Sequence, residues 1–225
     1  MIKKESRQFF ISVEGVNCET MYFEHVAELI NQSNSTYNLK ICPRKSSPLE
    51  FAKQTAYRTR DRNRNSLLPY IHIQDIEDYH DEFHRAKFYK LIDEIRITER
   101  LYKISYALGY TNYTFELWML LHVAKMDYQV QGRKAYLQPI NKWFKKNYSS
   151  LDEFKRKTEF EKILNEFVTL DSVKLAVQRA EAIVLNNTVE HKSKEIYKGF
   201  AFFHDNPDLS LHNIIKLIFE TCEVK

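Results

Sequence analysis

The sequence predicts an α/β fold in which a small parallel sheet, flanked by helices, is followed by a C-terminal helical lobe. Strand-like and helix-like segments alternate through the first half of the chain, a pattern typical of a parallel sheet covered by helices. From Gly132 onward the apolar residues recur only at helical spacing. We therefore expect an α/β core over residues 1–128 and a helical lobe, packed on that core, over residues 129–225.

Four short segments have the apolar and partly β-branched composition of buried strands. We expect these strands at residues 9–13, 38–42, 70–74 and 102–107. Right-handed crossovers between parallel strands place their carboxyl ends along one edge of the sheet, where functional sites in such folds gather. Residues that directly follow these strands are therefore the first candidates for a functional site.

Helices are expected between and after the strands, from the spacing of apolar residues and from residues that favour helix ends. Asn17 suits the N-cap of the first helix, and Pro48 suits the first position of the second. Further helices are expected at 81–95 and over the apolar segment 114–124. In the lobe we expect helices only, with a polar stretch at 186–208, and we place them at 134–148, 151–167, 170–186 and 210–222.

Composition and charge restrict the class of protein. The 225 residues are 44% hydrophobic and include only 4 Gly and 5 Pro, which predicts a substantial core and argues against a disordered chain. The formal net charge of +4 permits a nucleic-acid partner without demanding one. Cys18, Cys42 and Cys222 form no CxxC pair, so we expect neither a disulfide framework nor a zinc cage, and a cytoplasmic location. No segment resembles a signal peptide or a membrane span.

Acidic residues follow two of the expected strands. Glu14 closes the first strand, and Asp75 and Glu77 follow the third at positions that point to one side of an extended segment. Asp78 is close enough to contribute. Clustered carboxylates raise one another's pKa, and Mg²⁺, which prefers oxygen ligands and activates water in phosphodiester cleavage, relieves their repulsion. These residues alone leave two interpretations open, a metal site and solvated acidic residues at strand ends.

Four blocks of the sequence resemble the RloB/AbiLii family, a Toprim-like group found beside ATPases in bacterial anti-phage defence. EGVNCETMYF at 14–23 is similar to the family's EGxxTExxYF, and IQDIED at 73–78 is similar to its strand ending in DxD. TNYTFELWMLLH at 111–122 is close to SNPxFELWLLLHF, and NPDLSLHNIIKLI at 206–218 is similar to the family's C-terminal block. The order and spacing of the blocks also agree. The chain departs from the pattern at Cys18, at Glu77 in place of the second Asp of DxD, and at Tyr113-Thr114.

The resemblance implies a sheet of Toprim type and a role for each matching residue. Glu14 would act as a general acid/base or a metal ligand. Asp75 and Glu77 would hold Mg²⁺, or Mn²⁺, with Asp78 as a helper. Glu19 matches the family's second Glu and lies in the first turn of a helix, where the dipole favours a carboxylate. It is a candidate catalytic residue, and a simple helix-start acid is the alternative.

Two further candidates lie in the FELW block. A charged Glu inside an apolar helix is unfavourable unless it is paired or functional, which makes Glu116 a candidate catalytic residue. His122 ends the apolar run and is a second catalytic candidate. A buried histidine with satisfied hydrogen bonds is the alternative interpretation of His122.

Two basic segments are candidates for nucleic-acid binding, because basic residues interleaved with aromatic ones suit phosphate contacts and base stacking. The second segment, Lys145 and Lys146 beside Trp143, equally suits a solvated helix end. The first segment favours nucleic acid slightly and contains Arg58, Arg60, Arg62 and Arg64.

The resemblance also implies the biological role. The chain has no GxxxxGK(S/T) motif, so an ATP site would come from an ABC- or AAA-type ATPase partner. We expect a Mg²⁺-dependent nuclease that acts as the toxic effector of abortive infection, with RNA, and tRNA in particular, favoured over DNA. The alternative is a non-catalytic subunit that recognises nucleic acid or a phage protein and signals to the ATPase. No membrane association is expected, and a homodimer is left open.

Overall fold

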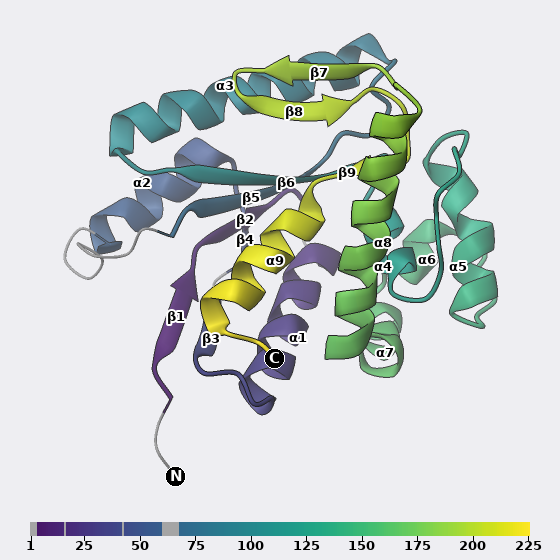
Figure 1. The fold of residues 1–225 in the computed structure, drawn as a ribbon, viewed down its shortest axis with the longest axis horizontal. Coiled ribbons are helices and arrows are strands. Elements are labelled where there is room, and N and C mark those ends of the chain that lie inside the picture. The colour runs from purple at the N-terminus through teal and green to yellow at the C-terminus, as the bar shows by residue number, and fades with distance from the viewer. Residues whose placement is uncertain (1–3, 16, 42, 60–67) are drawn as a thin grey trace.

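The protein was analysed as a computed structural model. It describes residues 4–15, 17–41, 43–59 and 68–225. Within these residues the central feature is a five-stranded sheet of order β4-β2-β5-β6-β9 (Figure 1). Its strands are β2 (Ile11–Val13), β4 (Arg44–Lys45), β5 (Tyr70–Asp75), β6 (Tyr106–Asn112) and β9 (Asp208–Leu209). The first four are parallel and β9 is antiparallel to β6, so the expected α/β fold with a largely parallel sheet is confirmed.

The register of the parallel strands aligns their carboxyl ends. Val13 lies opposite Ile73 on β5, and Asp75 lies opposite Thr111 on β6. Ile11, Val13 and Ile71 are fully buried, as expected for parallel strands covered on both faces. Because the strands end side by side, Glu14 and Asp75 emerge at the same edge of the sheet.

Helices cover both faces of the sheet (Figure 1). One hydrophobic cluster joins α2, α3 and the β7–β8 hairpin to one face, and a larger cluster joins α1, α4 and the helices that follow to the other. The helices are α1 (Cys18–Gln32), α2 (Pro48–Thr59), α3 (Glu82–Tyr102), α4 (Glu116–Leu121), α5 (Leu137–Trp143), α6 (Leu151–Phe154), α7 (Lys157–Phe167), α8 (Leu170–Val189) and α9 (Leu211–Cys222), with a 3-10 helix at Arg133–Tyr136.

Two strand expectations need correction. The single strand expected at 9–13 is two strands, because β1 (Ser6–Phe9) pairs in parallel with β3 (Asn38–Ile41) while β2 joins the central sheet. The strand expected at 102–107 begins only at Tyr106. Helix α3 continues to Tyr102 and ends where Lys103 takes a left-handed conformation with φ 52°.

The expectation of helices only after Gly132 is wrong. The polar stretch contains β7 (Lys194–Tyr197) and β8 (Phe200–Phe203), which form an antiparallel hairpin, and β9 adds to the central sheet. Phe202 explains why the hairpin is ordered, since it is buried and its ring lies 5.2 Å from that of Phe88 on α3. The domain boundary at residue 128 stays a prediction.

The segment that follows β9 completes the outer side of β6. The hydroxyl of Ser210 donates to the carbonyl of Leu108 at 2.9 Å and accepts from the backbone N–H of Tyr110 at 3.0 Å. Helix α9 then packs on β6 at Gly109, where an added Cβ would lie 2.9 Å from Ile214 and from Ile73. Glycine at 109 therefore allows the close approach of α9 to the sheet.

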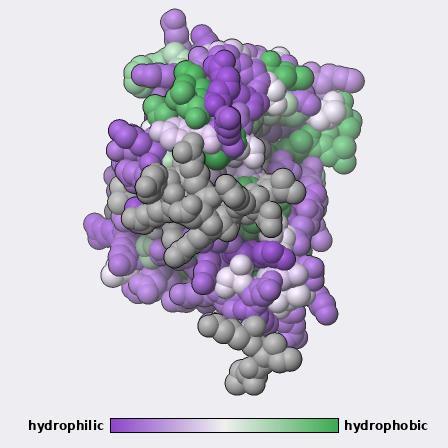
Figure 2. Space-filling model, turned by 90° about the vertical axis from the view of Figure 1, so that its left-hand side faces the viewer, coloured by the Kyte–Doolittle hydropathy of each residue, from purple (hydrophilic) through white to green (hydrophobic). Residues whose placement is uncertain are grey.

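The surface is mixed in character. Figure 2 shows a largely hydrophilic face, with hydrophobic surface gathered toward the end of the molecule where Figure 1 places α3, β7 and β8. Exposed hydrophobic side chains of these elements include Phe83, Leu101 and Ile196. Among the residues that the structure describes, none belongs to a helix with the length and apolar character needed to cross a membrane.

Candidate functional site

Glu14 and Asp75 lie next to each other at the carboxyl edge of the sheet. The backbone N–H of Glu14 donates to the carbonyl of Ile73 at 3.1 Å, which extends the pairing of β2 with β5 by one residue. The Glu14 carboxylate in turn accepts from the backbone N–H of Asp75 at 3.4 Å. Two of the carboxylates expected together from the sequence are therefore neighbours, because the strands that carry them are paired.

The Asp75 carboxyl lies in a strongly unfavourable environment for a negative charge. Burial raises its pKa well above the usual value for aspartate, and the carboxylates of Glu19 and Glu116 raise it further. The hydroxyl of Thr111, which donates to Asp75 Oδ1 at 2.7 Å, and the ammonium of Lys155 act in the opposite direction. The net effect favours a proton, or another cation, at Asp75.

Glu19 reaches the site from the first turn of α1. It is buried, and burial raises the pKa of its carboxyl, as do Glu116 and Glu14. A side chain at residue 15 would overlap the Glu19 carboxylate, so only glycine leaves the space that this carboxylate occupies. The spacing of Glu14, Gly15 and Glu19 in the sequence thus has a direct geometric reason.

Glu116 reaches the same site from the first turn of α4, where it is 1% exposed. Its Oε1 lies 2.9 Å from Lys155 Nζ, just after α6, and 3.9 Å from a guanidinium nitrogen of Arg133. Burial opposes the charge of Lys155, but Glu116 and Asp75 outweigh it and raise the lysine pKa. Glu116 is therefore paired, and it belongs to the electrostatic surroundings of Asp75.

The donor chemistry of this acidic set fits a hard divalent cation. Asp75, Glu19 and Glu116 bring three carboxylates against the cations Lys155 and Arg133, and Mg²⁺ prefers such oxygen ligands. Glu116 Oε2 accepts no hydrogen bond in the described part of the chain. In the same part, no group of three or more His, Cys, Asp or Glu side chains is arranged to hold a metal. Ion binding would therefore require these side chains to move toward one another.

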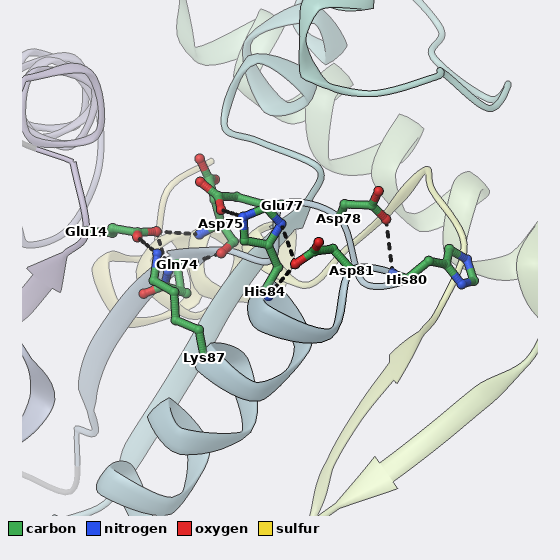
Figure 3. A network of polar contacts seen from close by, with 9 residues as sticks. All are labelled: Glu14, Gln74, Asp75, Glu77, Asp78, His80, Asp81, His84 and Lys87. Carbon is green, nitrogen blue, oxygen red and sulfur yellow. Dashed lines mark hydrogen bonds and ion pairs between the residues drawn. The ribbon is translucent and has the colours of Figure 1, made fainter.

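The Glu14 carboxylate is oriented by residues on β5 and α3 (Figure 3). Its Oε1 lies 2.5 Å from Lys87 Nζ, and its Oε2 accepts a hydrogen bond from the Gln74 side-chain amide. Gln74 Oε1 lies 3.4 Å from His72 Nε2, and His72 Nδ1 lies 2.8 Å from the Ser12 hydroxyl. A chain of polar contacts therefore runs from inside the sheet to Glu14.

The hydrogen positions in this chain follow from its end. Because Gln74 uses its NH₂ group on Glu14, its oxygen must accept, so His72 carries its proton on Nε2 and accepts from Ser12 on Nδ1. Burial lowers the pKa of His72 to about 4, which keeps the ring neutral at pH 7. The neutral tautomer thus sets the direction of the Gln74 amide.

Glu77 and Asp78 have other partners in this structure. The extended backbone assumed for residues 75–77 ends at Asp75, and Glu77 takes a φ of 62°. Its carboxylate lies 2.8 Å from His84 Nε2 on α3, and Asp78 Oδ1 accepts from the backbone N–H of His80 at 3.0 Å. Figure 3 shows Asp78 and His80 on the side of the group away from Glu14. The assignment of both carboxylates to a metal stays a prediction.

His122 has the surroundings of a structural histidine. It is 3% exposed, and burial lowers its pKa to about 4. Its Nε2 lies 3.1 Å from the Tyr22 hydroxyl and its Nδ1 lies 3.0 Å from the Trp118 carbonyl, so both ring nitrogens have partners within the core. These contacts agree with the satisfied buried histidine rather than with a catalytic group.

The basic segments are only partly described. Arg60, Arg62 and Arg64 lie outside the described residues, as does the side chain of Arg58. Lys145 is exposed just after α5, and Lys146 Nζ lies 2.9 Å from Glu166 Oε2, an ion pair that engages its charge. Binding of nucleic acid by these residues stays a prediction.

Sequence reasoning missed several residues of the site. Lys87 and Lys155 lie in ordinary charged stretches on or beside helices, and Gln74 and His72 read simply as strand residues. A helical face gives a partial signal for Lys87, since Lys87, Lys90 and Glu94 recur at spacings of three and four. Lys155 follows an unpredicted break between two short helices, and no local pattern marks it.

Comparison with known protein families identifies this arrangement. The family model described as "RloB: RloB-like protein" matches residues 9–218, nearly the whole chain and all of the elements that carry the acidic set. Searches of curated proteins and of solved structures gave no match. On the extent of the family match, the chain belongs to the RloB-like family.

Proposed function

We propose that this chain is a Mg²⁺-dependent nuclease of Toprim type. We further propose that it is the toxic effector of a bacterial anti-phage system and works in the cytoplasm with an ABC- or AAA-type ATPase. RNA, and tRNA in particular, is favoured over DNA as its substrate. The observation that carries the proposal is the adjacency of Glu14 and Asp75 at the ends of paired parallel strands, beside buried Glu19.

The residues have distinct roles in this proposal. Asp75, Glu14 and a reoriented Glu77 would hold the ion, which supplies an activated water and stabilises the leaving oxygen. Gln74 and Lys87 orient the Glu14 carboxylate toward the reacting phosphate, where it would take or give a proton. Negative charge at Glu19 and Glu116 makes ionisation of Asp75 unfavourable without a cation, which strengthens the attraction for the ion.

The direct test is cleavage by purified protein of labelled RNA and DNA, with Mg²⁺, with Mn²⁺ and with EDTA. Glu14→Gln and Asp75→Asn are expected to reduce the rate at least about a hundredfold, since each removes a charge from the reacting centre. Glu24→Gln is the matched control, because Glu24 is exposed on α1. Equal cleavage by the wild type and the two site variants would refute the proposal.

A non-catalytic recognition subunit of the same ATPase-containing complex is the second candidate. The contacts of Glu77 with His84 and of Asp78 with the His80 backbone favour it, because they occupy two of the four carboxylates expected to bind metal. Calorimetric titration with Mn²⁺ separates the candidates. A nuclease binds the ion, and Asp75→Asn and Glu77→Gln weaken that binding, whereas a recognition subunit shows no such difference.

A further inference from the structure

A cavity of about 460 Å³ lies beside Glu14 and opens to solvent. Its floor comes from β2 and β5, and its walls come from the end of β4, the start of α2 and one face of α3. The volume falls within the range typical of ligand sites. Because Glu14 is part of its lining, the cavity is continuous with the acidic set at the sheet edge.

The lining carries more positive than negative side chains. Lys87, Lys90 and Glu94 line it from α3, where spacings of three and four place them on one face. Lys45 lines it from the end of β4. Glu14 is the other acidic residue of the lining, so three lysines face two carboxylates.

Both carboxylates already have partners. Glu14 contacts Lys87, as described above, and Glu94 Oε1 accepts from the backbone N–H of Leu49 at 2.9 Å, which joins α3 to the start of α2. Across the part of the chain that the structure describes, Lys45 and Lys90 form no ion pair and no hydrogen bond. The unbalanced charge of the cavity therefore belongs to these two lysines.

The remaining lining does not offset this charge. His72 is neutral at pH 7, since burial lowers its pKa to about 4. Ser46 and Ser47 add hydroxyl groups at the start of α2, a helix of 12 residues whose dipole favours an anion at this end. Two free ammonium groups, hydroxyl donors and a helix start around a solvent-open cavity are suited to a phosphate group.

We propose that this cavity binds a phosphate of the substrate strand through Lys45 and Lys90, and so positions a neighbouring phosphodiester bond at Glu14. The inference rests on the proposed nuclease function, and it makes a single-stranded nucleic acid the substrate class. Lys87 is held by Glu14 and orients that carboxylate, so the strand contacts fall to the other two lysines.

Binding of a fluorescently labelled, short single-stranded RNA in EDTA tests the inference without cleavage. Lys45→Gln/Lys90→Gln is expected to bind several-fold more weakly than the wild type. Its plot of log affinity against log salt should be less steep by about 1.4, since each lost contact to a single strand removes about 0.7. Lys53→Gln/Lys157→Gln is the matched control, because both lysines are exposed and lie outside the cavity.

The outcomes separate this inference from the proposed function. Equal affinity and salt dependence in the two double variants, or no RNA binding by the wild type, would overturn the inference. Cleavage lost in Glu14→Gln would still support the nuclease in that case. A nucleoside monophosphate that bound as tightly as the RNA, and lost affinity in Lys45→Gln/Lys90→Gln, would assign the cavity to a free nucleotide and overturn the strand. Circular dichroism confirms that each variant is folded.

Discussion

At the scale of single residues, the absence of a side chain at Gly15 shapes the site. The Glu19 carboxylate lies where a Cβ at residue 15 would be, so α1 can direct an acidic group into the space beside Asp75. The overlapping atoms are the end of a flexible side chain, which can rotate away. A substitution here should therefore displace Glu19 without greatly disturbing the backbone.

Gly15→Ala is expected to lower cleavage as much as Glu19→Gln does, because both remove the carboxylate from the site. The free energy of unfolding should change by less than about 1 kcal/mol, since surface adjustments of this kind are usually small. Cleavage rates and urea denaturation measure the two effects. The double variant Gly15→Ala/Glu19→Gln is the decisive control, because a further loss beyond either single variant would mean that Gly15 acts independently of Glu19.

At the scale of elements, the short helices of the second half are tied to the sheet edge by charge. Lys155, just after α6, meets Glu116 at the start of α4, and both are largely removed from solvent. Removing one partner of a buried pair leaves an uncompensated charge, whereas removing both does not. This pair therefore links the placement of α6 to the integrity of the acidic set.

Lys155→Met is expected to lower the free energy of unfolding by about 3 kcal/mol, because Glu116 loses its closest cation. Lys155→Met/Glu116→Met should recover most of this stability, since both charges are then absent. Urea denaturation at neutral pH measures each variant. A double variant as unstable as the single one would show that packing of the lysine stem, not its charge, matters here.

The sequence predicts elements best where one face or both faces are apolar. Helix α1, strand β5 and the start of α2 at Pro48 follow local patterns, and each lies close to its expected position. The β7–β8 hairpin was missed because its order depends on Phe202 packing against α3, a contact distant in the chain. The adjacency of Glu14 and Asp75 could be predicted from strand ends, but the pairing of Glu116 with Lys155 could not, since it depends on how α4 and α6 pack.

At the scale of the whole molecule, the acidic set makes the protein less stable than its core would allow. The pKa of Asp75 is raised, so the folded state holds its proton more tightly than the unfolded state does. Stability linked to this group is therefore full below the ordinary aspartate pKa of 3.8 and falls as the pH rises through the raised value. At neutral pH and without metal, ionised Asp75 destabilises the fold.

Asp75→Asn is thus expected to raise the Tm of the metal-free protein at pH 7 by a few degrees, at about 2–4 °C per kcal/mol for a chain of this length. The gain should shrink as the pH falls toward 4, because wild-type Asp75 is then protonated. Thermal unfolding in EDTA across this pH range measures the difference, with Asp127→Asn as an exposed control. A lower Tm for Asp75→Asn at pH 7 would contradict the raised pKa.

The C-terminal segment has a further consequence for the behaviour of the chain in solution. β9 and the Ser210 hydroxyl occupy backbone groups on the outer side of β6 that would otherwise be free to pair with another strand. An unprotected strand edge is a template for association between chains. A chain shortened before Asn206 would present β6 as such an edge, next to the hydrophobic surface that α9 covers. The last twenty residues therefore serve as a guard against self-association as well as a part of the fold.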